Sequence, residues 1–464
     1  MHCHGATDLD SLAITSITTI VLDCPVAGQT VVVRVDRFFL ATGATLRLPD
    51  APDQEAMTAG CGGPAIFGLP GPAGLRLQVW AREIIALGTI DLSAGGAGQS
   101  VRAQGCNDRD IQAQGGDGGQ TFDIEFIGES VTDAATRTGG FGGSGGDAFA
   151  IQGAPPDNES NGSNGTILAP DGGNGTVVLY TARGNQADGA DGRNATARGG
   201  SGAAGPTRAG HGGNAVAVAG AGLNGSIVGG SVGRGGNGGR ALASGGGAGT
   251  GPLGAHAGNA TALGGRGGDA ANVTIELSGN VSAGSGGRGG DAQAFGGDAN
   301  VSAIQGGHGG NAFAFSGFGG RGGSDRTLQS RPGDGGFPGS ALAVGGSGGT
   351  CPTCNGGAGG NATAYSGKGG DGGGGVSRPG LGAPMQAVIA TGGEGGFGFN
   401  GGPGGSAIGV QGNAGNAGPR LEPFPSAVLS ATNSTTASKK ESPSVGPMIA
   451  GVVLLVLAAR RRRL

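Results

Sequence analysis

The residues best placed to bind a ligand are aspartates that follow short runs of glycine. The segment Gly142–Ala150 reads GGSGGDAFA, which fits the nonapeptide GGxGxDxUx, in which backbone carbonyls and an Asp hold Ca²⁺. Asp147 and Phe149 occupy the motif's places, and Asp269 and Asp291 fill the same aspartate slot in later copies. Sites of this type need consecutive nine-residue repeats, whereas these copies lie about 20 residues apart or more. The spacing favours structural turn residues, with calcium at the three aspartates as the alternative.

Two of the six cysteines lie close together in the segment CPTCNGG, Cys351–Gly357. This segment resembles one knuckle of the DnaJ-type zinc domain, CxxCxGxG. A tetrahedral structural zinc site needs four ligands, and no second knuckle follows. Disulfides are favoured in exported proteins. We therefore predict a disulfide between Cys351 and Cys354, with free thiols and a metal site as the alternatives.

The sequence offers little support for enzyme chemistry. It contains no Walker or HExxH motif, and its Asp and Glu residues occur singly in turns. His211, His256 and His308 fall in the variable slot of the glycine repeats, which other copies fill with residues such as Arg266 and Arg288. Such a slot suits a solvated loop better than a catalytic base. We predict a non-enzymatic protein without a cofactor, and a polysaccharide-acting enzyme on a β-helix scaffold is the alternative.

The composition points to a repetitive fold rather than a conventional core. Glycine supplies 115 of 464 residues, against an average share of roughly 7%. Aromatic residues make up 4% and charged residues 13%, and the net charge is −4. The low charge argues against disorder, and the small net charge argues against a nucleic-acid partner. So much glycine is useful only where φ is positive or where backbones touch.

Glycine recurs as a unit, GGxGG followed by Asn or Asp and then Ala. Clear and looser copies begin at Gly142, Gly264, Gly286, Gly306, Gly356, Ala209, Gly235 and Gly401. Clear copies continue as Ala-x-Ala-x, for example Ala312–Phe315, which predicts a strand with a small residue on one face. Three consecutive copies are spaced by about 20 residues, which we interpret as one rung of a stack. Residues 136–418 are therefore predicted to form an all-β, elongated glycine-rich β-solenoid, with a polyglycine II helix bundle as the alternative.

Two parts of the chain resemble known surface proteins. The glycine runs, such as Gly356–Gly373, resemble the PGRS region of mycobacterial PE-PGRS surface proteins. Residues 17–135 are predicted to be a strand-rich, solenoid-like region, because Thr30–Asp36 and Ala44–Leu48 alternate with period 2. Within this region, Gly74–Gly98 combines strand, turn, strand and glycine loop, and it resembles rungs of filamentous-haemagglutinin-like exported β-helices.

The ends of the chain carry different signals. Residues 1–16 show no signal-peptide pattern and are expected to be a disordered N-terminus. Residues 419–444 form a Pro/Ser/Thr linker. The C-terminal segment 445–464 contains an apolar stretch from Val445 to Ala459, followed by Arg460, Arg461, Arg462 and Arg463. It resembles the tripartite sorting signals of exosortase and archaeosortase substrates, and the alternative is a plain membrane anchor through one short hydrophobic helix with the arginines in the cytoplasm.

These features together predict that the protein is located at the cell surface. Sequons that are candidate glycosylation sites are at Asn194, Asn259, Asn272, Asn280, Asn300 and Asn361. We expect a cell-surface structural or adhesive protein, anchored by its C-terminus in a membrane or released to the exterior. A surface binding module for glycans or ice is the alternative. The expected partners are the membrane, surface glycans or further copies of the chain, and no nucleic acid.

Overall fold

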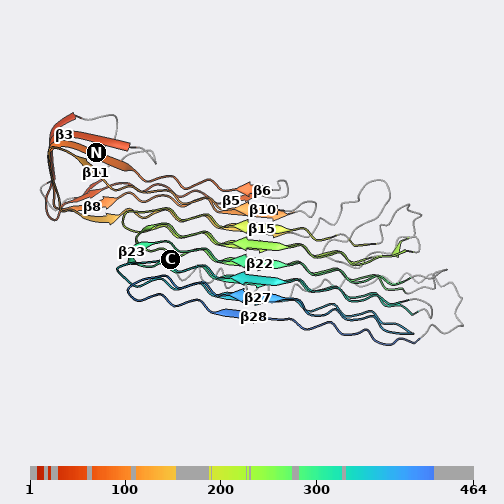
Figure 1. The fold of residues 1–464 in the computed structure, drawn as a ribbon. Coiled ribbons are helices and arrows are strands. Elements are labelled where there is room, and N and C mark those ends of the chain that lie inside the picture. Colours follow the sequence, from red (N-terminus) through yellow and green to blue (C-terminus); the bar gives the residue numbers. More distant parts are fainter. Residues whose placement is uncertain are drawn as a thin grey trace. The chain divides into compact units, whose positions relative to one another are not determined.

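Figure 1 shows the computed structural model of the chain, which describes residues 8–14, 19–21, 30–59, 65–105, 111–152, 188–189, 191–225, 227–228, 231–273, 282–326 and 331–422. These residues belong to the first of two units, Met1–Pro423, while the second unit, Phe424–Leu464, lies outside them. The described residues contain strands and no α-helix. They form stacked, mainly parallel sheets typical of a β-solenoid-like fold.

Two sheets belong to the N-terminal region. The first contains β1 (Asp8–Ile14), β3 (Thr30–Leu40), β7 (Arg76–Ala86), β11 (Glu125–Ile127) and β12 (Ser130–Asp133). The second contains β2 (Thr19–Val21), β4 (Thr45–Arg47), β8 (Thr89–Leu92) and β13 (Thr136–Gly139). All pairs within them are parallel, and β3 pairs with β7 along its length, from Thr30 opposite Arg76 to Leu40 opposite Ala86.

The core of this region consists of branched apolar side chains. In β7 buried and exposed positions alternate over most of the strand, as expected where one face of a sheet is covered. Phe38, Leu40, Leu77, Ile84 and Ile90 are fully buried in one cluster. Each such side chain stabilises the fold by about 1.5–3 kcal/mol relative to an exposed position. The strand alternation predicted for residues 17–135 is therefore present.

The glycine-rich part forms two further parallel sheets, which we call the seven-stranded and the eight-stranded sheet. The seven-stranded sheet contains β6 (Ala65–Phe67), β10 (Ile111–Gln114), β15 (Ala195–Arg198), β19 (Ala241–Ser244), β22 (Ala292–Phe295), β25 (Ala341–Val344) and β27 (Val388–Thr391). The eight-stranded sheet contains β5 (Met57–Ala59), β9 (Val101–Gly105), β14 (Ala148–Gln152), β16 (Ala215–Val218), β21 (Ala260–Leu263), β24 (Ala312–Phe315), β26 (Ala362–Tyr365) and β28 (Ala407–Val410). Two small pairs complete the described strands: β17 (Ile227–Val228) with β18 (Ser231–Val232), and β20 (Gly251–Leu253) with β23 (Ser302–Gln305).

Alanine forms the core between these two sheets. The first and third residues of each Ala-x-Ala-x strand are buried, as Ala312 and Ala314 are in β24 and Ala341 and Ala343 are in β25. Alanines from both sheets belong to one buried cluster, so the small residues predicted for one strand face lie between the layers. Figure 1 shows the strands as short arrows, flanked on both sides by long passes of glycine-rich chain.

We call each crossing of the stack by the chain a pass. Outside the strands, the hydrogen bonds of a pass repeat every three residues: one N–H group of each triplet donates within its layer and the next donates to the opposite layer. Gly115 and Gly118 donate their N–H groups within a layer, to the carbonyls of Arg198 and Ser201 in the next rung. The next glycine of each triplet donates across the layers. One such ladder runs through Gly405, Gly393, Gly360, Gly346, Gly310, Gly297, Gly258, Gly246, Gly213, Gly200, Gly146 and Gly116, each donating to the next. Each pass is thus bonded both to its own layer and to the opposite layer.

Close approach of backbones, rather than unusual dihedral angles, is the reason for the glycines. Among the described glycines, only Gly43, Gly139 and Gly140 have positive φ. At Gly286 a Cβ atom would stand 2.0 Å from the carbonyl oxygen of Gly320, which lies in the opposite layer. A side chain would therefore force the layers apart and break the hydrogen bonds between them.

Two expectations from the sequence are wrong. Residues 8–14 form β1, which pairs in parallel with β3, so residues 1–16 are not disordered throughout. The rung is also longer than about 20 residues. Apart from the two small pairs, successive described strands from β14 to β28 alternate between the two sheets, so in-register residues of one sheet are 45 residues apart at Asn214 and Asn259, and 52 apart at Asn259 and Asn311.

Substitution by valine should destabilise the fold much more at one residue of a repeat than at its neighbour. In Gly289→Val the Cβ would lie 2.2 Å from the carbonyl oxygen of Gly317, so we expect a loss of about 3 kcal/mol or more. In Arg288→Val only an exposed ion pair with Asp291 is lost, and the expected cost is below about 1 kcal/mol. Thermal unfolding of the two variants measures the difference, and equal midpoints would contradict a glycine-specific contact.

Candidate functional site

Asparagine and aspartate side chains connect successive rungs in columns. The Oδ1 atom of Asp147 accepts the backbone N–H of Asn214 at 2.9 Å. The column continues through Asn214, Asn259, Asn311, Asn361 and Ser406, where each Asn Oδ1 accepts the N–H of the next residue. A side-chain oxygen thus supplies the acceptor that the backbone does not offer at this position. This role explains why Asx follows the glycines.

The other two calcium candidates lie in separate columns. Asp269 accepts the N–H of Arg321 at 2.7 Å and forms an ion pair with Arg266. Asp291 accepts both the backbone N–H and the hydroxyl of Ser340. The structure therefore does not bring Asp147, Asp269 and Asp291 together. Within the described part of the chain, no cluster of three or more His, Cys, Asp or Glu residues could hold a metal ion. Calcium binding remains a prediction.

The sequon asparagines serve similar contacts. Asn194, Asn272 and Asn361 accept backbone N–H groups of the next rung. In Asn259 the amide nitrogen that would carry a glycan donates to the Oδ1 atom of Asn214. In Asn300 the corresponding nitrogen donates to the carbonyl of Ala248. Asn280 lies outside the described residues, and glycosylation remains a prediction. The anchor residues from Val445 to Arg463 also lie outside them, and no helix in the described ranges is long and apolar enough to cross a membrane.

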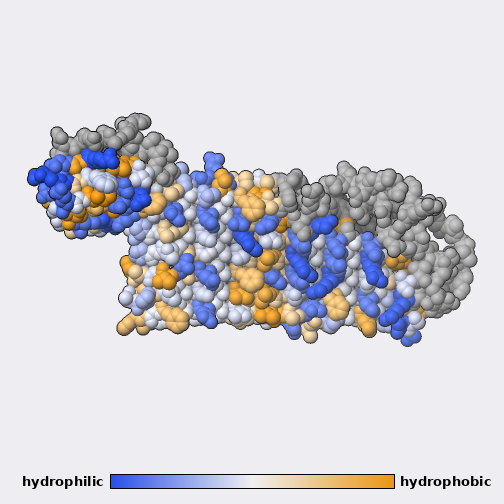
Figure 2. Space-filling model, turned by 45° about the horizontal axis from the view of Figure 1, so that its top comes forward, coloured by the Kyte–Doolittle hydropathy of each residue, from blue (hydrophilic) through white to orange (hydrophobic). Residues whose placement is uncertain are grey.

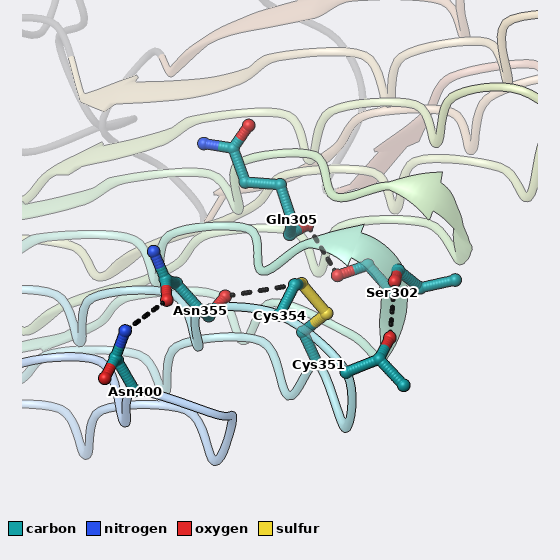
Figure 3. The surroundings of a disulfide bond; sticks show 8 residues. Ser302, Gln305, Cys351, Cys354, Asn355 and Asn400 are labelled. Carbon is teal, nitrogen blue, oxygen red and sulfur yellow. Dashed lines mark hydrogen bonds between the residues drawn. A yellow bond between two sulfur atoms is a disulfide. The ribbon is translucent and has the colours of Figure 1, made fainter.

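A disulfide joins Cys351 to Cys354, with 5.2 Å between their Cα atoms. Cys351 is fully buried, and its N–H donates to the carbonyl of Phe397 in the next rung. Figure 3 shows the disulfide beside Asn355, whose side chain accepts a hydrogen bond from Asn400. The disulfide therefore fixes a tight loop at the end of one rung, where the chain leaves the regular glycine pattern.

A shallow depression of about 550 Å³ lies beside this loop. Its lining includes Ile304, Gln305, His308, Thr353, Asn355 and Phe399. The Phe399 ring is 83% exposed, and the polar groups around it are two amides, a hydroxyl and an imidazole. An exposed aromatic ring beside neutral hydrogen-bonding groups is suited to a polar, uncharged ligand.

Three histidines form a stacked column that the sequence analysis did not anticipate. The rings of His211 and His256 are 5.4 Å apart, and those of His256 and His308 are 4.8 Å apart. Each Nδ1 atom accepts a backbone N–H of the next rung, from His256, His308 and Ala358 in turn. The histidines thus connect successive rungs in the same way as the Asx columns do. Their spacing in sequence equals the rung length, which would have revealed the column had that length been known.

Comparisons with known proteins provide little further information. No protein-family model and no curated protein matches the chain. One solved structure that matches is the springtail antifreeze protein from Granisotoma rainieri, described as a nine polyproline type II helical bundle. It is 21% identical and covers 49% of this chain and 90% of its own, with a TM-score of 0.09. At that score the match supports no argument about fold or function.

The Asx columns should weaken in acid. The N–H of Asn416, followed by the ammonium of Lys368, holds the pKa of the Asp371 carboxyl below its usual value. A depressed pKa stabilises the fold above the unfolded value of about 3.9, and this contribution is lost as the pH falls through the folded pKa. Asp371→Asn keeps the oxygen acceptor without the charge.

We expect Asp371→Asn to cost about 0.5–1 kcal/mol at pH 7, because the side chain is partly exposed to solvent. At pH 2.5 more of the wild-type carboxyl is protonated than at pH 7, so the difference between the two unfolding temperatures should be smaller there. Thermal unfolding at both pH values checks this, and an equal difference at pH 7 and pH 2.5 would rule out the charge as its source.

Proposed function

We propose that the protein is a non-enzymatic structural or adhesive element of a cell surface, a rigid glycine-rich β-solenoid held by its C-terminus. In this proposal the short strands are β-structure and the passes between them are polyglycine II, so both alternatives raised by the sequence are combined in one body. The three-residue rhythm of the glycine hydrogen bonds supports this combination, because polyglycine II has three residues per turn.

The observation that carries the proposal is the glycine ladder across the layers. From Gly405 to Gly116 it passes through every rung between them without interruption. In a stack of repeats each rung is stabilised mainly by its neighbours, and here the in-layer and cross-layer bonds act on the same rung. Such a body resists bending and stretching because many bonds must break together, which is the property that a stalk or coat element needs.

The outer surface supports structure or adhesion better than ice binding. Figure 2 shows apolar side chains gathered in a band over the strands of one face, with polar bands beside it. The slot four residues before each strand of the seven-stranded sheet carries Asn237, Arg288 and Phe337 in successive rungs. A surface that matches ice would present one residue type in register over its length, whereas here the histidine column repeats one type over three rungs and slots such as this one change from rung to rung.

A second candidate function is glycan binding in the depression beside the disulfide. The exposed ring of Phe399 and the neutral polar groups of Gln305, Thr353 and Asn355 favour it. Sugars offer both C–H faces for an aromatic ring and hydroxyls for amide partners. This function is compatible with an adhesive role at a surface.

Phe399→Ala should remove most of the affinity for a neutral oligosaccharide, at least about tenfold, without destabilising the fold. Phe397→Ala is the matched control, because Phe397 is also exposed, at 80%, but does not line the depression. Calorimetric titration with a panel of neutral oligosaccharides measures both. Equal affinities for the two variants, or no binding to the wild type, would exclude this second function.

Variants of the C-terminal segment 445–464 test the proposed location at the cell surface. In an expressing host, deletion of residues 445–464 should release the protein into the medium, because the apolar stretch and the arginines are the proposed attachment. Replacing Arg460–Arg463 by serine keeps the apolar stretch but removes the orientation signal, and should reduce surface display. Fractionation and mass spectrometry of the termini report the result. Full-length protein in the cytoplasm with an intact tail would overturn the proposal.

A further inference from the structure

The two ends of the glycine stack are built differently. At the N-terminal end, one cross-layer ladder runs from Gly143 through Gly119 and Gly96 to the carbonyl of Pro72. Proline has no N–H group, so it can accept the last hydrogen bond but cannot continue the ladder. Pro52 occupies the corresponding cross-layer slot in the other layer, where its carbonyl faces Gly96. The first rung is thus closed by residues that do not fit the interior pattern.

The first rung also carries negative charge. Asp50, Asp53 and Glu55 lie in the loop ahead of β5, where Asp50 and Asp53 also accept the backbone N–H groups of Ala94 and Ala97 in the next rung. Proline and charge are the usual means by which proteins prevent further pairing at a sheet edge. This end therefore has the features of a protected edge.

The C-terminal end retains the interior pattern although no later rung is present in the described residues. Ala362 pairs with Ala407, so Gly401 and Gly404 occupy the slots that Gly356 and Gly359 fill one rung earlier. At Gly356 and Gly359 a Cβ atom would lie 2.0 and 2.1 Å from carbonyl oxygens of the opposite layer. At Gly401 and Gly404 the nearest atoms would be 3.9 and 3.6 Å away. No atom of the described residues lies close enough to require glycine at these two positions.

The last rung is also exposed and nearly uncharged. β27 and β28 end their sheets, and all four residues of β28 are exposed. Apolar side chains of these strands, Ile389 and Ile408, are 56% and 50% exposed. Between residues 379 and 419 the only charged residue is Glu394. Two copies of this edge would therefore approach without strong repulsion and would bury apolar surface.

We propose that the edge formed by β27, β28 and the adjoining glycine passes binds the same edge of a second copy of this chain. Gly401 and Gly404 leave room for the close approach of another glycine-rich rung, and the last rung of a second copy provides one. The protected N-terminal edge rules out head-to-tail growth, so the association is tail to tail and closes at a dimer. A two-fold axis across the junction makes the strands that meet there antiparallel.

The test uses the full chain and two arginine substitutions at opposite ends. We expect wild-type protein to sediment as a dimer in micromolar solution, and Gly404→Arg to raise the dimer dissociation constant at least about tenfold. At a concentration low enough for both proteins to be monomeric, the thermal midpoint of Gly404→Arg should equal that of the wild type, since the atom nearest to its Cβ in its own chain is 3.6 Å away. Ala56→Arg is the matched control: it adds the same charge at an exposed position of the first rung and should leave the dimer intact.

Several outcomes would overturn the proposal. A wild-type chain that is monomeric throughout the concentration range has no such interface. A dimer that survives Gly404→Arg associates through another surface, and a dimer that Ala56→Arg dissociates uses the first rung. If the full chain is monomeric and only a chain lacking residues 424–464 dimerises, the occupant of the edge is this chain's own tail and not a second copy.

Discussion

The contact on which the structure depends is that of a glycine backbone with the carbonyl oxygen of the opposite layer. At positions such as Gly286, where a Cβ atom would lie 2.0 Å from the carbonyl oxygen of Gly320, the distance leaves no room for even a methyl group. The contact allows each pass to bond in two directions, and it allows the two sheets to pack on a core that consists mainly of alanine. Among the described residues, large apolar side chains such as Phe38 and Ile84 dominate the core of the N-terminal sheets, and Ile66, Val101 and Ile111 join the alanines only in the first rungs.

The sequence predicts the local elements better than their arrangement. The alternation around Thr30–Asp36 and in the Ala-x-Ala-x segments depends on neighbouring residues, and the structure has strands at both places. The expectations of the rung length and of disorder at residues 8–14 are wrong, because both features depend on pairing between distant segments. Whether consecutive repeats stack in one layer or alternate between two cannot be deduced from a period along the chain. The role of Asp147 was obscured for the same reason, since its partner Asn214 lies 67 residues away.

The structure separates the residues that specify the stack from those that face outward. Glycine, alanine and the Asx columns form its hydrogen bonds and its core, while the structure restricts the residue type little at the third position of each triplet. His256 shows that this division is not complete, because an imidazole there replaces an Asx acceptor and stacks on its neighbours. Imidazole Nδ1 atoms in one column and Asx Oδ1 atoms in others thus accept the backbone N–H of the next rung in the same way.

The alternation between layers has a consequence for how the gene can change in length. One rung consists of two passes that run in opposite directions, and it returns to the same layer only after both. Loss of a single pass would move every later strand into the other layer and reverse its direction, which would separate His308 from His256 and each Asx from its column. Loss of a complete rung, as between Ala260 and Ala312, would keep every column in register. Length variation in such a chain is therefore expected to occur in whole rungs.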